Sequence, residues 1–249
     1  MTAALLALAL ASYGWFLKGE ALRRRWGGAP APGSRTARFR RWIVRAGLSF
    51  GFVSLLALAL LGRLEAFWAL PHEFDALAAA SRMALLGREV APGNPGRLAA
   101  AVAGGLGGGA LVGLSIATWR RRRGKGDLRI GQIGALLPRT RGELGWGGGI
   151  AITAGIVEEA YFRLLLPLLI AGATGSALGG FVVATLLFGL AHGYQRIWGM
   201  VATTLVGALF AALYLYSGAL WLAMLAHGLL DLNSLVLRPA FAGAWRVRH

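Results

Sequence analysis

The chain has 249 residues, of which 57% are hydrophobic and 14% charged. A soluble domain carries about 45–50% apolar and about 25% charged residues, so a soluble globular protein is excluded. The chain has no cysteine, which excludes disulfide bonds and thiolate metal sites. Its apolar residues form stretches near the length of about 20 residues that a bilayer requires. We therefore expect an all-α, polytopic transmembrane helical bundle.

The formal net charge is +16, from 26 Lys and Arg against 10 Asp and Glu. The basic runs Arg23–Arg25, Arg38–Arg45 and Arg120–Arg123 flank apolar stretches, as the positive-inside rule describes. No alternation of aromatic and basic residues accompanies them, so nucleic acid is not an expected partner. The expected partner of these arginines is the lipid bilayer.

The N-terminal half predicts three spans and one surface helix. Thr2–Leu17 is apolar and is followed, not preceded, by positive charge, which favours a retained first helix over a signal peptide. Ile43–Leu61 is the second expected span. His72–Leu86 is expected to form an amphipathic helix on the outer surface. Leu98–Trp119 is the third span, and its glycines in Gly104–Gly109 favour close helix packing rather than a phosphate loop.

The C-terminal half predicts four further spans, near Leu144–Ile170, Ser176–Ala191, Gly199–Tyr216 and Ala219–Leu237. Seven spans with the N-terminus outside place every arginine-rich segment and the C-terminal tail in the cytoplasm. Splitting Leu144–Ile170 would give eight spans and break that agreement. We expect a multi-pass inner (plasma) membrane protein, with an N-terminal transmembrane region over residues 1–141 and a C-terminal transmembrane core over residues 142–249.

Ionisable residues are rare in this core, and they are costly. A charge at the bilayer centre costs about 2.5–3.5 kcal/mol even on the lenient insertion scale. Between Gly145 and Leu237 the charged residues and histidines are Glu158, Glu159, Arg163, His192, Arg196, His227 and Asp231. A sequence this apolar would lack them unless a specific interaction or a function offset the cost.

The spacing of Glu158, Glu159 and Arg163 predicts different roles for the two glutamates. Glu159 and Arg163 are four residues apart, so on a helix they share a face and can pair. Glu158 is rotated about 100° from Glu159 and points elsewhere. An ion pair of this kind can serve only to fix helix register. It also leaves Glu158 available for chemistry.

The remaining residues lie on later helices. His227 and Asp231 are four apart on the last helix, and His192 ends its own helix beside Gly193. Each of these features alone has a structural explanation, such as a hydrogen-bonded packing histidine. Together on consecutive helices, they favour one buried polar pocket containing Glu158, His192, His227 and Asp231.

Three motifs carry a family resemblance. Residues 158–163 read EExxxR, residues 188–192 read FxxxH, and residues 227–231 read Hxxx(N/D). In this order and spacing they resemble the CAAX-protease and bacteriocin-processing (CPBP) family of intramembrane proteases. The resemblance covers about Leu136–Leu237. It implies an endopeptidase that cleaves near the C-terminus or the membrane-proximal part of a membrane-anchored protein substrate.

The resemblance also implies residue roles. Glu158 would be the general base that activates water, and His192 would help to hold that water. Glu159 and Arg163 would brace the site. His227 and residue 231 would stabilise the oxyanion, which is usually the largest catalytic contribution.

Residue 231 departs from the family, whose best-studied members have Asn there. An ionised Asp231 only accepts hydrogen bonds and would repel an oxyanion. It could orient His227 as an imidazolium, be protonated, or help to bind a metal. A divalent zinc ion is conceivable on Glu158, His192, His227 and Asp231. We favour metal-independent catalysis, because no HExxH sequence places two ligands on one helix.

Three alternatives stay open at this point. The first is a sorting protease of the same family that removes C-terminal anchor tails, with Leu64–Arg97 serving recognition. The second is a non-enzymatic bacteriocin-immunity factor or membrane scaffold. The third is a transporter, which the lack of inverted repeats disfavours.

Overall fold

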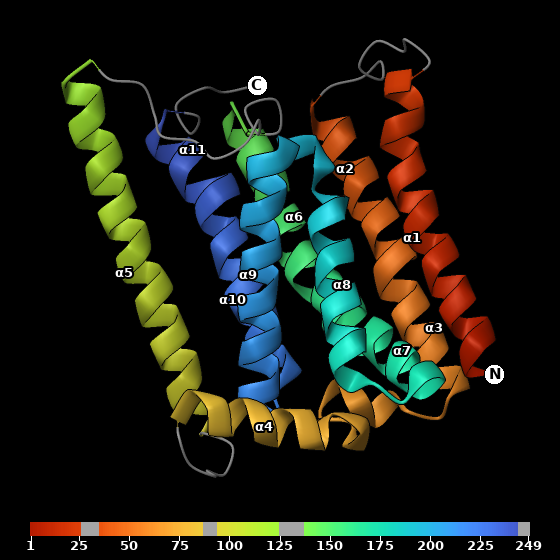
Figure 1. Cartoon of the computed structure of the whole chain (residues 1–249). Coiled ribbons are helices and arrows are strands. Elements are labelled where there is room, and N and C mark those ends of the chain that lie inside the picture. The colour runs from red at the N-terminus through yellow and green to blue at the C-terminus, as the bar shows by residue number, and fades with distance from the viewer. Residues whose placement is uncertain (26–34, 87–93, 125–136, 244–249) are drawn as a thin grey trace.

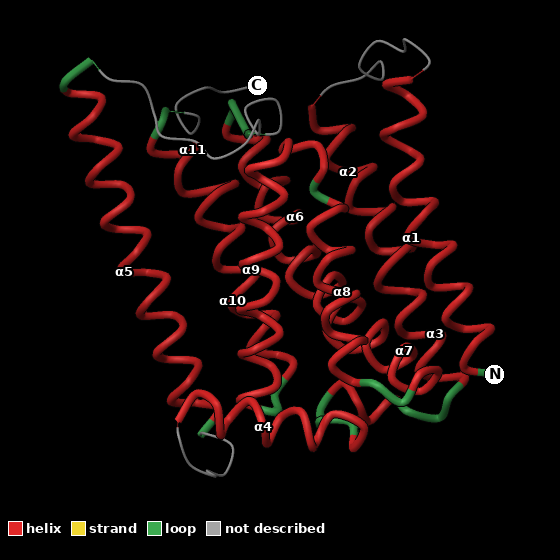
Figure 2. The backbone as a smooth tube through the Cα atoms, viewed as in Figure 1, coloured by secondary structure: helices red, strands yellow, loops and turns green. Residues whose placement is uncertain are grey.

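The computed structural model of the chain describes residues 1–25, 35–86, 94–124 and 137–243. Every regular element in these ranges is a helix, and Figure 2 shows only short loops between them. The predicted all-α class is confirmed. Among the described residues, four segments have the length and hydropathy of a membrane span: Arg35–Leu60, Gly96–Arg120, Gly193–Ser217 and Leu220–Phe241. The count of about seven spans and the division at residue 141 stay predictions.

The helices of the first half include one long rod that contains a π-helical turn. They are α1 (Thr2–Arg25), α2 (Arg35–Ala46), the π-helical η1 (Gly47–Phe52), α3 (Val53–Leu60), the 3₁₀ turns η2 (Leu64–Phe67) and η3 (His72–Phe74), α4 (Asp75–Leu86) and α5 (Pro95–Arg122). Because α2, η1 and α3 follow without a break, they form one continuous rod.

The second half contains two more rods of this kind, each with a π-helical turn inside it. Its elements are α6 (Arg141–Glu159), the π-helical η4 (Ala160–Leu165), α7 (Leu166–Thr174), α8 (Ala177–Ala191), the 3₁₀ turn η5 (Gly193–Gln195), α9 (Arg196–Ser217), α10 (Leu220–Leu232), the π-helical η6 (Asn233–Leu237) and α11 (Arg238–Phe241). The segment predicted as one span over Leu144–Ile170 is therefore helical throughout and is not split by a loop.

Local sequence signals explain where these helices begin and end. The Thr140 hydroxyl accepts a hydrogen bond from the Glu143 amide and caps α6, and Ser176 caps α8 through the Gly179 amide. Gly175 ends α7 and Gly218 ends α9 with left-handed backbone, at φ of 75° and 69°.

The helices stand side by side in a bundle (Figure 1). Helix α6 packs against α2 and α10, α8 packs between α7 and α9, and α1 packs against α7. Helix α5 stands at the edge and contacts α10. The ends of α2, α5 and α6 that carry arginines lie at the same end of the bundle (Figure 1). Which side of the membrane that end faces stays a prediction.

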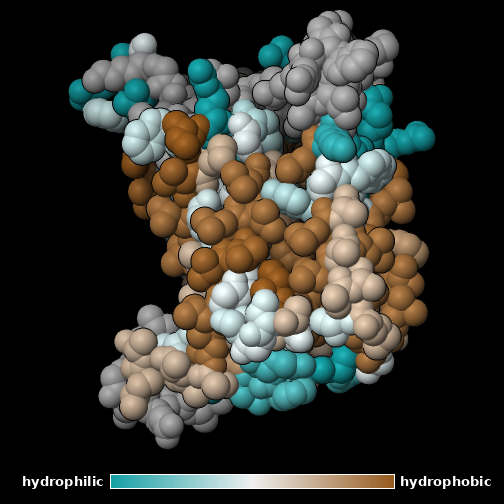
Figure 3. All heavy atoms as spheres, turned by 45° about the vertical axis from the view of Figure 1, so that its right-hand side comes forward, coloured by the Kyte–Doolittle hydropathy of each residue, from teal (hydrophilic) through white to brown (hydrophobic). Residues whose placement is uncertain are grey.

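The surface has the distribution of a membrane protein. Figure 3 shows hydrophobic residues in a broad band across the middle of one face, with hydrophilic residues at both ends. Large apolar side chains in the spans are exposed, including Leu55, Leu111, Leu205 and Leu209. Such a continuous apolar surface is unfavourable in water and fits a lipid environment.

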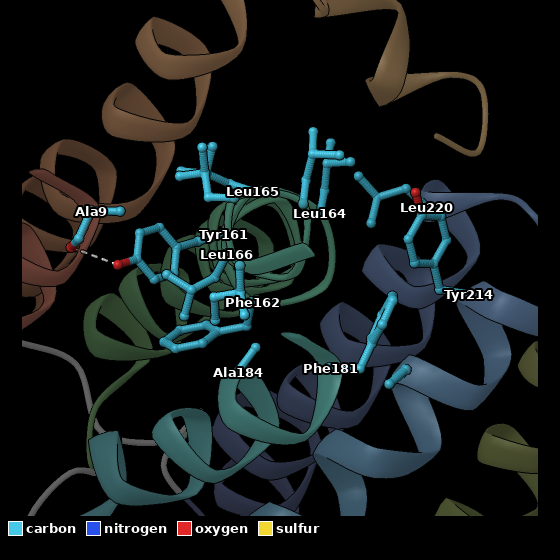
Figure 4. Close-up of a cluster of buried hydrophobic side chains, with 14 of the residues drawn as sticks. Ala9, Tyr161, Phe162, Leu164, Leu165, Leu166, Phe181, Ala184, Tyr214 and Leu220 are labelled. Atoms are coloured by element: carbon cyan, nitrogen blue, oxygen red, sulfur yellow. Dashed lines mark hydrogen bonds between the residues drawn. The ribbon is translucent and has the colours of Figure 1, made fainter. Parts of the chain in front are cut away.

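The core of the bundle is centred on η4. Tyr161, Phe162 and Leu164–Leu166 are fully or almost fully buried there (Figure 4). The Tyr161 hydroxyl donates to the carbonyl oxygen of Ala9 at 2.7 Å, and this hydrogen bond links α1 to η4. Because η4 directly follows the paired glutamates, the most tightly enclosed part of the fold supports the candidate site.

The helix predicted over His72–Leu86 is present, and its place on the outer surface of the membrane stays a prediction. Turn η3 and helix α4 cover this range and lie across one end of the bundle (Figure 1). Phe74 packs against Phe181 with ring centroids 4.9 Å apart, and Arg82 donates to the Leu215 carbonyl at 3.3 Å. An aromatic contact and a hydrogen bond to the end of α9 thus hold the helix in place.

Helices α6 and α10 cross unusually closely, and glycine makes this possible. A Cβ atom at Gly155 would lie 2.8 Å from the Met224 carbonyl oxygen and 2.9 Å from the Gly228 nitrogen. A Cβ at Gly147 would lie 2.8 Å from the Leu235 carbonyl oxygen. Small residues at such crossings let helix backbones approach each other in a membrane.

We expect Gly155→Ala to lower the thermal unfolding midpoint in detergent, because overpacking of a close contact costs about 1–3 kcal/mol. Gly145→Ala on the same helix is the matched control, because nothing lies within 4 Å of a Cβ there. The control should leave the midpoint unchanged or raise it slightly, since alanine is a better helix former by roughly 0.5–1 kcal/mol. Equal midpoints in the two variants would contradict the close crossing.

A second expectation concerns the loop before α4. Arg63 donates to both carboxylate oxygens of Glu73, at 2.9 and 3.1 Å, and this lowers the pKa of Glu73 below its usual value. A lowered folded-state pKa adds stability that is present above the unfolded value of about 4.3 and is lost as pH falls through the folded value.

We therefore expect the unfolding midpoint to fall on acidification from about pH 6 to about pH 3, and to fall less in Arg63→Gln. Arg82→Gln is the control, because Arg82 bonds a carbonyl oxygen rather than a carboxylate. The same pH dependence in Arg63→Gln and the native chain would show that this ion pair contributes nothing.

Candidate active site

The two adjacent glutamates end α6, and the π-helical turn η4 follows them directly. Pro167 explains the wide turn: it lacks the amide that would bond the carbonyl of Arg163, and its ring would collide with that carbonyl in a regular α-helix. π-Helical turns are common at functional sites. Both Glu158 and Glu159 are buried, and so is Arg163 within η4.

Glu159 is the centre of a buried charge cluster. Its Oε2 lies 3.1 Å from Arg163 Nε, and both side chains are completely buried. Its Oε1 accepts a hydrogen bond of 2.7 Å from Nδ1 of His227. The pair predicted between Glu159 and Arg163 is therefore present, and a histidine 68 residues further along the chain shares it.

Glu158 lies on the other side of the His227 ring. Its Oε2 is 4.0 Å from His227 Nε2, too far for a hydrogen bond. Asp231 Oδ2 lies 3.6 Å from the same nitrogen. Within the described part of the chain, Glu158 Oε2 is buried without a hydrogen-bond partner. Buried polar atoms are nearly always hydrogen-bonded to protein or water, so this oxygen calls for a water molecule or a ligand.

His192 is connected to the cluster through an aromatic ring. Its Nδ1 donates to the Phe188 carbonyl at 2.8 Å, which leaves Nε2 as the acceptor of the neutral ring. The Phe188 ring lies 4.9 Å from the His192 ring and 5.8 Å from the His227 ring. Within the described residues, His192 makes no hydrogen bond or ion pair with Glu158, His227 or Asp231. The structure thus brings Glu158, His227 and Asp231 together. That these three share one buried polar pocket with His192 stays a prediction.

Two residues of α9 contribute to the cluster, and the sequence analysis missed both. The Gly207 carbonyl accepts a hydrogen bond of 3.1 Å from Arg163 Nη2. The Phe210 ring stacks on the His227 ring, with centroids 5.2 Å apart and an interplanar angle of 23°. Neither residue belongs to a charged or catalytic motif, so the chain offered no signal beyond a glycine in an apolar helix.

The fit of a metal ion can be judged from the same side chains. Among the described residues, no group of three or more His, Asp and Glu side chains is arranged to hold a metal ion. His192 and His227 each use Nδ1 in a hydrogen bond, to the Phe188 carbonyl and to Glu159, which leaves Nε2 of each ring for another partner. The zinc ion considered on Glu158, His192, His227 and Asp231 stays a prediction.

Comparison with known proteins adds a family. Residues 140–233 match the family model described as Type II CAAX prenyl endopeptidase Rce1-like. No curated protein and no solved structure matches the chain. The matched segment runs from the N-cap of α6 into η6 and contains all six candidate site residues. The segment that carries the candidate site belongs to the CAAX-protease and bacteriocin-processing (CPBP) family, a family of membrane proteases.

Proposed function

We propose that this protein is an intramembrane endopeptidase in which Glu158 activates the attacking water. The observation that carries the proposal is the buried Glu158 Oε2, which has no hydrogen-bond partner among the described residues. It lies beside His227, whose Nδ1 is hydrogen-bonded to Glu159. An unpaired carboxylate oxygen in a dry bundle is a good acceptor for a water proton. The substrate is a membrane-anchored protein, cleaved near its C-terminus or its membrane-proximal part.

The reaction follows from these positions. Glu158 accepts a proton from water while the water oxygen attacks the carbon of the scissile peptide bond. The carbonyl becomes a tetrahedral oxyanion. As the carbon–nitrogen bond breaks, Glu158 returns the proton to the leaving amine, so that the products are a new carboxyl terminus and a new amino terminus. One carboxylate thus acts first as base and then as acid.

His227 is the proposed oxyanion donor. Its Nδ1 is occupied by Glu159, so Nε2 is the nitrogen that faces the reacting atoms beside Glu158. A ring that donates from both nitrogens is positively charged, and the carboxylates of Glu159 and Asp231 at 2.7 and 3.6 Å balance that charge. Asp231 therefore acts through His227 rather than on the oxyanion, which accounts for an Asp where the best-studied relatives have Asn.

His192 is the proposed second contact of the water. Because Nδ1 donates to the Phe188 carbonyl, Nε2 is free to accept a hydrogen bond from water or substrate. The ring stands at the C-terminal end of α8 and is half buried, so water or substrate can reach it.

Glu158→Gln keeps the shape of the side chain and removes its basicity. We expect it to lower the rate of cleavage of a membrane-anchored substrate by about 10²–10⁴-fold, the usual contribution of a general base. Glu65→Gln is the control, because the Glu65 side chain is 62% exposed and lies in the turn η2, away from the site. Cleavage by purified protein in lipid vesicles measures both. Full activity in Glu158→Gln would rule out Glu158 as the base that activates the water.

The metal-independent form of the proposal has its own test. Because the described side chains do not form a three-ligand cluster, we expect cleavage to continue after prolonged dialysis against a strong chelator. Metal analysis of the dialysed, active protein should find less than one ion per chain. The chelator presaturated with zinc serves as the control for its effects on the vesicles. Loss of activity that added zinc restores would replace the glutamate mechanism with a metal mechanism.

A further inference from the structure

Helix α9 carries none of the three motifs, yet it touches two of the charged residues of the site. Gly207 accepts a hydrogen bond from Arg163, and Phe210 stacks on His227. The Phe210 ring also lies 5.6 Å from the Arg163 guanidinium. These contacts come from one face of α9, since the two residues are three positions apart.

His227 needs a second constraint besides its hydrogen bond. The covalent bond to Cβ and the hydrogen bond from Nδ1 to Glu159 hold the ring at two points, which leaves tilting of the ring plane about the line between them. Phe210 lies against the flat face of the ring, and Phe188 meets it edge-on at 90°. A stacked face and a perpendicular edge together define the plane, and that plane decides whether Nε2 faces Glu158.

Arg163 is held in the same way. The Phe188 ring lies 4.1 Å beneath its guanidinium, and the Gly207 carbonyl accepts from Nη2. A Cβ atom at Gly207 would lie 2.9 Å from that Nη2 and 2.8 Å from Phe188 Cδ1. Only glycine at this position lets the backbone of α9 approach both groups.

We propose that Phe210 is a positioning residue for His227. Through Phe210 and Gly207, α9 contacts His227 and Arg163 and holds both side chains in place. The inference rests on the proposed function in one respect, that His227 Nε2 serves the reaction. Phe210 does not touch the reacting atoms itself; it holds the imidazole whose Nε2 does.

A buried phenylalanine also contributes plain packing energy, so the test needs a matched control. Phe181 is such a residue: it is 5% exposed against 7% for Phe210, and it also packs against aromatic rings. Its partners are Phe74 and Tyr214, which belong to the core near α4 and not to the site. Phe181→Leu removes a similar ring without touching His227.

The kinetic experiment compares Phe210→Leu, Phe210→Tyr and Phe181→Leu in vesicles. Phe210→Leu should lower kcat about 10- to 100-fold per folded molecule and change KM little, because a misplacement near 1 Å costs this much. Phe210→Tyr keeps a stacking ring and should recover most of kcat. Phe181→Leu should lower the unfolding midpoint and leave kcat near the native value. Equal kcat in Phe210→Leu and Phe181→Leu would overturn the proposal.

A second readout does not depend on protease activity. Diethyl pyrocarbonate modifies accessible imidazole nitrogens, and mass spectrometry gives its rate at His227 alone. The native chain and Phe181→Leu should react slowly, because the ring is enclosed, whereas Phe210→Leu should react several-fold faster. Equal rates in all three would overturn the positioning role. If labelling follows the expected order and the native chain cleaves nothing, the proposed function fails and the positioning of His227 stands.

Discussion

The structure depends on one completely buried carboxylate, that of Glu159. Removing a charge from water is expensive, and breaking a buried ion pair by removing one partner typically costs about 3–5 kcal/mol. Here one oxygen forms an ion pair with Arg163 at 3.1 Å and the other accepts a hydrogen bond from His227, so the negative charge is compensated. These partners come from η4 and α10, which means that the same compensation fixes how the α6–α7 rod meets the last helix.

Such compensation is possible only if the helix backbones come close, and the small residues provide this. Gly155 stands one helical turn before Glu159, and it meets Gly228, the neighbour of His227. On α9, Gly207 lets a backbone carbonyl reach Arg163. The apolar, glycine-rich helices and the charged motifs are therefore parts of one arrangement. In lipid, where apolar surface gives no preference between partners, shape and polar contacts decide which helices pair.

Sequence reasoning was strong where it used helical periodicity. Residues four apart share a face, which predicted the Glu159–Arg163 and His227–Asp231 contacts, and amphipathicity predicted the helix over His72–Leu86. It was weak where contacts join different helices. The Glu159–His227 bond spans 68 residues and depends on how α10 is rotated about its axis. A membrane helix that is hydrophobic on all sides gives no sequence signal for that rotation. For the same reason no pattern marked Phe210.

The adjacent glutamates show how one dipeptide can hold two different chemical states. On a helix, consecutive side chains diverge by about 100°, so Glu158 and Glu159 cannot share one environment. Glu159 points to the arginine and the histidine and is neutralised. Glu158 points past the far nitrogen of the same histidine, and its Oε2 has no hydrogen-bond partner in the described part of the chain. A proton acceptor must be unpaired, yet an unpaired buried charge destabilises a fold. The two carboxylates lie on opposite sides of the His227 imidazole. The ion pair and hydrogen bond of Glu159 can therefore offset the cost of burying Glu158.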